Sequence, residues 1–125
     1  MAEPHWKDEP EEHDYPAAES YLSLLSAPEH AGRLVQLLRQ APLQRFQAKD
    51  LLRASGLPLL PPDNVHVAKD LAKVRTGGRL SPVLLVRGEL ARGRPLTIAD
   101  GYHRVCASHH LDEDAEVPGR LADQP

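Results

Sequence analysis

The stretch from residue 96 to residue 108 constrains the fold of this chain most strongly. Residues 96–99 form a short apolar run typical of a strand, and Asp100-Gly101 ends that run immediately before a helical pattern begins. Glycine permits a tight strand-to-helix turn and leaves room for a ligand against the backbone. The sequence therefore predicts a strand, a sharp turn and a helix in direct succession.

The first turn of this predicted helix carries two basic side chains, His103 and Arg104. Backbone N–H groups in a first turn lack intrahelical partners, and the helix dipole adds partial positive charge there, so acidic residues are normally favoured. Basic residues at this position are understandable if an anion is held at the turn, and phosphate is the expected one. The alternative is an ordinary strand–turn–helix unit in which Arg104 pairs with a neighbouring carboxylate.

Two motifs resemble elements of the ParB/sulfiredoxin superfamily. The run Asp100-Gly101-Tyr102-His103-Arg104, followed by Ala107, is similar to the G-x-H-R-x-x-A element of that family. Upstream, residues 78–87 (GRLSPVLLVR) resemble its G-L-x-P-I-x-V stretch, where a helix ends and a strand begins. The resemblance covers about residues 45–122.

The resemblance implies a stand-alone ParB-like domain that binds a nucleotide or another phosphate ligand at the strand-to-helix turn. The candidate nucleotides are ATP and CTP, accompanied by Mg²⁺ where the ligand requires it. Lys69 and Lys73 lie with His66 on one stripe of the predicted preceding helix and could reach the phosphates, although a solvated helix face is the simpler interpretation. The candidate phosphate-binding residues are Asp100, Gly101, Tyr102, His103, Arg104, Ser81, Lys69 and Lys73.

Whether the chain is an enzyme stays open at this point. One alternative is a non-catalytic interaction or regulatory module of the same fold, and another is a nucleotide-dependent phosphotransferase or nuclease. Tyr102 stands where sulfiredoxin-like reductases carry a catalytic cysteine, so that activity is disfavoured. Cys106 is expected to be a buried core residue. The spacing of His103, His109 and His110 does not suit a metal site.

Composition limits the partners of the chain. Its 125 residues carry a formal net charge of −3, which argues against specific DNA binding because DNA-binding domains are typically basic. A single cysteine suits a reducing compartment, and no apolar run has the length of a membrane span. We therefore expect a cytoplasmic protein without a membrane partner.

The pattern along the chain predicts a small mixed β-sheet with flanking helices, of α+β (mixed α/β) class, preceded by a helical hairpin. Residues 1–15 are expected to form a mobile acidic tail, residues 16–42 the hairpin and residues 43–125 the sheet domain. The hairpin could also bind a protein partner or a second copy of the chain. Ser26 and Asp63 are the predicted N-caps of two helices, Ser26 in capping-box spacing with Glu29. Residues 83–86 form a continuous apolar run, which predicts a strand buried on both faces.

Overall fold

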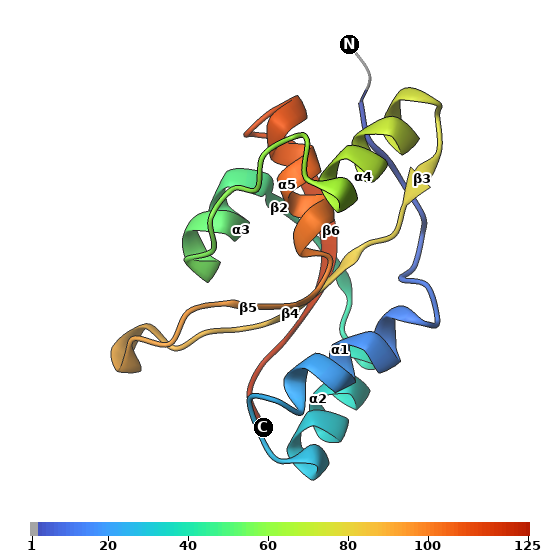
Figure 1. Cartoon of the computed structure of the whole chain (residues 1–125). Helices are drawn as coiled ribbons and strands as arrows, with labels where there is room; N and C mark the ends of the chain where they lie inside the picture. The colour runs from blue at the N-terminus through green and yellow to red at the C-terminus, as the bar shows by residue number, and fades with distance from the viewer. Residues whose placement is uncertain (1–2) are drawn as a thin grey trace.

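A computed structural model of the chain describes residues 3–125 and shows a mixed sheet at its centre (Figure 1). The sheet has the strand order β2-β6-β4-β5, formed by β2 (Leu43–Gln47), β6 (Glu116–Ala122), β4 (Val83–Val86) and β5 (Thr97–Asp100). Strand β6 pairs antiparallel with β2 and parallel with β4, and β4 pairs antiparallel with β5. A short helical turn, η1 (Leu90–Arg92), lies in the connection from β4 to β5. The predicted α+β class and mixed sheet are confirmed.

Helices pack on both faces of this sheet (Figure 1). Helices α1 (Asp14–Leu22) and α2 (Pro28–Gln40) form one core with Leu84 and Val86, and this pair is the predicted hairpin. Helices α3 (Ala48–Ser55), α4 (Val65–Arg75) and α5 (Tyr102–Leu111) form the other core with Val83 and Leu85. Because successive side chains of a strand point to opposite faces, β4 supplies both cores. Its complete burial agrees with the apolar run in the sequence.

The expectation of a mobile acidic tail over residues 1–15 is wrong for the part that the structure describes. Residues His5–Trp6 form a short strand, β1, that pairs in parallel with β3 (Arg79–Leu80), and the Lys7 amide donates to the Leu80 carbonyl at 2.8 Å. Residues 1 and 2 lie outside the described residues. The segment that follows β1 crosses beside β3 and leads directly into α1 (Figure 1).

The acidic residues of this segment have partners within the segment and on helix α2, which explains its order. Glu12 forms an ion pair with Arg39 of α2 at 2.8 Å, and Glu11 pairs with Lys7. Asp14 is only 5% exposed and accepts a hydrogen bond from the Glu11 amide at 2.9 Å. A run of like charges is expected to be disordered only if its charges stay unpaired. Arg39 is distant from Glu12 in the sequence, so the local pattern did not indicate this pair.

Two predicted helix N-caps are each corrected by one residue. The N-cap of α2 is Ala27, whose side chain cannot cap, and Pro28 occupies the first turn; the Ser26 hydroxyl instead donates to the Leu22 carbonyl at the end of α1. The N-cap of α4 is Asn64, not Asp63. Its side-chain oxygen accepts from the His66 and Val67 amides at 3.0 and 3.2 Å.

Candidate functional site

The strand-to-helix turn has the geometry that the sequence predicts. Gly101 is the N-cap of α5 with φ +108°, a conformation that other residues rarely adopt. A Cβ at this position would lie 2.4 Å from Cγ1 of Val83, so the turn also requires the absence of a side chain. No side chain caps the first turn of α5 within the described chain. Its backbone N–H groups are therefore available to an anion.

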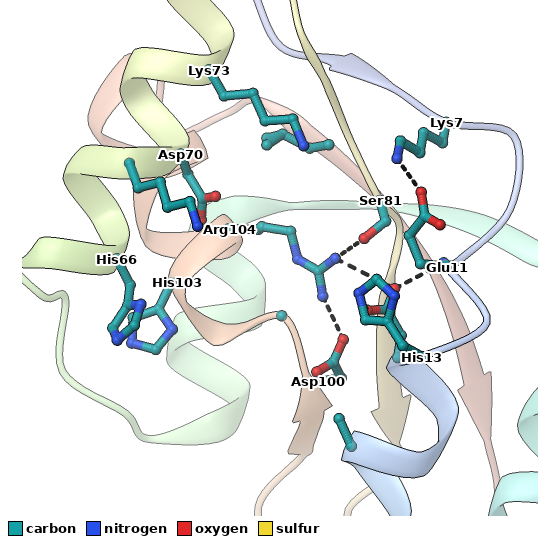
Figure 2. A pocket seen from close by; sticks show the side chains of 15 residues that line it. Lys7, Glu11, His13, His66, Asp70, Lys73, Ser81, Asp100, His103 and Arg104 are labelled. Carbon is teal, nitrogen blue, oxygen red and sulfur yellow. Dashed lines mark hydrogen bonds and ion pairs between the residues drawn. The ribbon is translucent and has the colours of Figure 1, made fainter.

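A cavity of about 620 Å³ lies beside this turn (Figure 2). Its volume is within the range of small-molecule sites. Three regions form its walls: the N-terminal segment with the start of α1, one face of α4, and the turn between β5 and α5. Seven of the eight predicted site residues line it: Lys69, Lys73, Ser81, Asp100, Gly101, His103 and Arg104.

Tyr102 is the predicted site residue that does not line the cavity. Its hydroxyl donates to the Pro58 carbonyl, and its ring packs against the core formed by α3 and α5. Tyr102 therefore attaches the start of α5 to the loop between α3 and α4. We assign it a structural role at this turn.

Arg104 occupies the inner wall of the cavity, and its charge is already paired. Its side chain is 13% exposed, and Nη2 lies 2.6 Å from Oδ2 of Asp100. Nη1 donates to the Ser81 hydroxyl and lies 3.7 Å from Oδ2 of Asp14 (Figure 2). The alternative that the sequence left open, in which Arg104 pairs with a neighbouring carboxylate, is therefore realised twice.

Asp100 acts as this partner of Arg104 and does not cap α5. Burial raises its pKa, and the Arg104 guanidinium opposes that rise, while the nearby Asp14 carboxylate reinforces it. A guanidinium placed between two carboxylates stabilises their charged forms. The Asp14–Arg104–Asp100 cluster therefore joins α1, α5 and β5 at the base of the cavity.

Helix α4 contributes two lysines to the cavity, and in the described chain their charges are not paired with carboxylates as the charge of Arg104 is. Lys69 and Lys73 are exposed, and within the described residues neither makes an ion pair with a carboxylate. Between them lies Asp70, a half-buried carboxylate whose pKa is raised by burial, an effect opposed mainly by Arg104 and His103. The cavity thus holds two unpaired ammonium groups close to one poorly solvated carboxylate.

Two imidazoles face each other across the junction of α4 and α5. The ring centroids of His66 and His103 lie 4.6 Å apart with an interplanar angle of 43° (Figure 2). His103 is half-buried, and its pKa is lowered first by burial and then by His66, while Asp70 opposes the shift. The sequence placed His66 on the basic stripe of this helix but did not predict its contact with His103.

The sequence did not predict the cavity wall formed by the N-terminal segment. It also did not assign two lining residues of α4 to the site. The missed lining residues with charged or titratable side chains are Lys7, Glu11, His13, Asp14, His66 and Asp70. The sequence already placed His66 on one stripe with Lys69 and Lys73, and the i, i+4 spacing of Asp70 from His66 is a local signal that could have added Asp70 to this group. The N-terminal residues carry no comparable signal, because their place in the cavity depends on the pairing of β1 with β3.

Cys106 is free and fully buried, as predicted. Burial raises the pKa of its thiol, which leaves little reactive thiolate at neutral pH. Within residues 3–125, no three His, Cys, Asp or Glu side chains are grouped so that they could hold a metal ion. None of the described helices has the length and apolar character needed to cross a membrane.

Comparison of the chain with protein-family models, curated proteins and solved structures finds no significant match. The site itself defines a small α+β domain with a polar, charge-rich cavity at a strand-to-helix turn.

Proposed function

We propose that this chain binds a phosphate-bearing ligand, a nucleotide or another phosphate ester, in the cavity beside Gly101. The observation that carries the proposal is that Lys69 and Lys73, which have no carboxylate partner in the described chain, line the same cavity as the uncapped start of α5. A helix N-terminus and ammonium groups are both groups that bind phosphate.

Charge pairing supports the same assignment. Four carboxylates and four Lys or Arg side chains line the cavity, but Lys7 and Arg104 are paired with Glu11, Asp100 and Asp14. The two lysines of α4 are therefore the cations that an incoming anion would meet. In this proposal Arg104 holds the turn in place by binding Asp100, and Ser81 supports Arg104.

The order of the elements around the cavity also supports membership of the ParB/sulfiredoxin superfamily, which we include in the proposal. Helix α4 ends at Arg75, shortly before Gly77 and Gly78, strand β4 begins after Ser81, and the next strand leads into the Gly101 turn. Of that family's chemistry, the proposal takes over phosphate binding alone.

Calorimetric titration with inorganic phosphate, pyrophosphate, ATP and CTP, with and without Mg²⁺, tests the proposal. We expect binding of at least one of these ligands. The double substitution Lys69→Gln with Lys73→Gln should weaken it by about tenfold or more, the scale of one charged hydrogen bond lost. Lys49→Gln is the matched control, because Lys49 lies outside the cavity and pairs with Asp114. If none of the four ligands binds, the proposal is wrong. It is also wrong if the Lys69→Gln, Lys73→Gln double variant binds them with wild-type affinity, as the Lys49→Gln control should.

A further inference from the structure

The His66–His103 pair gives this cavity a property that its other charges do not have. His66 is in the first turn of α4 and His103 in the first turn of α5, so the two rings meet where two helix N-termini converge. Both rings line the cavity, and a histidine near its ordinary pKa changes charge close to neutral pH.

The groups around the pair include both signs of charge. On α4 these groups are Lys69, Asp70 and Lys73, and on α5 they are Tyr102 and Arg104. The ring centroid of Tyr102 lies 5.6 Å from that of His103. Strand β5 contributes Asp100, and the N-terminal wall contributes Lys7, Glu11, His13 and Asp14. Four of these side chains are formal cations and four are formal anions. With neutral imidazoles the lining has a formal charge near zero, so each proton added to His66 or His103 leaves the cavity positive.

Simultaneous protonation of the two rings would place like charges side by side in a cavity that holds no anion. Two imidazolium rings at a centroid separation of 4.6 Å repel each other, and the helix N-termini add partial positive charge. Burial, and after it the neighbouring His66, lowers the pKa of His103. An anion of charge −2 in the cavity would remove that repulsion, and by linkage its binding would favour proton uptake.

We infer that His66 is a ligand-binding residue of the cavity and that, together with His103, it couples the capture of a dianionic phosphate group to the uptake of a proton. The inference rests on the proposed function and extends it, because it assigns a role to a residue outside the Gly101–Arg104 motif. It also defines the ligand more closely, as a terminal phosphate that presents two negative charges.

Sulfate is the appropriate probe, because its charge stays at −2 throughout the range in which histidine titrates, whereas phosphate itself titrates there. Calorimetric titrations of the full chain at constant ionic strength should show sulfate affinity rising by about tenfold or more from roughly pH 8 to roughly pH 5.5. Near pH 6.5, titrations in two buffers of different ionisation enthalpy should show an uptake of about one proton per sulfate.

Substitutions identify the groups that take up the proton. His66→Gln and His103→Gln should each reduce the pH dependence, and the double variant should bind sulfate with nearly the same affinity across the range. His30→Gln is the matched control, because His30 lies on α2 beside Gln124 and does not line the cavity. His13→Gln tests the third histidine of the lining, whose side chain is 81% exposed, and should keep most of the wild-type pH dependence.

The outcomes separate this inference from the proposed function. If neither sulfate nor any of the four phosphate ligands binds at any pH, both are wrong. If phosphate binds through Lys69 and Lys73 but sulfate affinity is independent of pH, this inference alone is overturned. It is also overturned if the double histidine variant keeps the wild-type pH dependence, because the proton would then be taken up by Asp70 or Asp100, whose pKa values burial raises.

Discussion

Arg104 belongs to the sequence motif that suggests anion binding, but its main contacts are with side chains of the protein itself. In the sequence it is a basic residue at a helix start, which suggests a bound anion. In the structure its guanidinium lies between Asp100 and Asp14, two carboxylates from different elements. A guanidinium presents several donors in a fixed plane and can satisfy both carboxylates together. The anions that Arg104 meets in the structure belong to the protein, which is the alternative that the sequence left open.

Arg104→Ala should consequently destabilise the fold. Removing the guanidinium leaves the carboxylates of Asp14 and Asp100 without their cation in a poorly solvated place, and the loss of a buried partner costs about 3 kcal/mol. Urea unfolding at neutral pH measures the change. The loss should shrink as the pH falls, because protonation removes the unpaired charge and the pKa of Asp100 is already raised.

Arg53→Ala is the control for this prediction. Arg53 is 82% exposed and pairs with Asp50 at 3.8 Å on the surface of α3, so its removal should change the free energy of unfolding very little. Equal effects of the two substitutions would show that the Asp14–Arg104–Asp100 cluster does not stabilise the protein.

Cys106 gives a second prediction at this scale. Cys106→Ser places a hydroxyl in a fully buried, apolar environment and should lower the free energy of unfolding by about 1–3 kcal/mol while leaving ligand binding nearly intact. The wild-type thiol should react slowly with a thiol reagent in the native protein and rapidly in urea, because burial raises its pKa. Rapid labelling of the native protein would contradict the packing role.

At the scale of elements, the sequence predicted what depends on local periodicity. The apolar run of β4 and the turn at Gly101 both appear where the sequence placed them, because each reflects a local conformational requirement. The helix starts were less certain because several neighbouring residues could cap each of them. Asp63 and Asn64 are both good N-cap residues, and only the path of the preceding loop decides between them.

This choice can be tested with two neighbouring alanine substitutions. Asn64→Ala removes the oxygen that accepts from the His66 and Val67 amides and should cost about 1 kcal/mol of stability. Asp63→Ala, one residue earlier, should have a much smaller effect. Urea unfolding of the two variants measures both effects. A larger loss of stability from Asp63→Ala would show that Asp63 is the N-cap, as the sequence predicted.

At the scale of the whole molecule, the cavity depends on contacts that no local pattern reveals. Its α4 and α5 walls come from segments whose helical character is visible in the sequence, and four predicted residues, Lys69, Lys73, His103 and Arg104, lie on these two helices. The third wall exists because β1 pairs with β3, a contact between residues more than seventy positions apart. An acidic, proline-containing N-terminus resembles a disordered tail until its carboxylates are matched with Lys7, Arg39 and Arg104.

Trp6 reports directly on this third wall, because it is the only tryptophan in the chain and lies in β1. It is half-buried, pairs in register with Leu80 and packs against the core of α3 and α5. Native emission should therefore be blue-shifted and quenched by acrylamide less than that of free N-acetyltryptophanamide. In urea it should shift to the red with the same midpoint as far-UV circular dichroism, since small single domains unfold cooperatively. A mobile tail would give a solvent-like emission that does not change on unfolding. That result would remove the N-terminal segment from the cavity and leave only α4, β5 and α5 to hold a ligand.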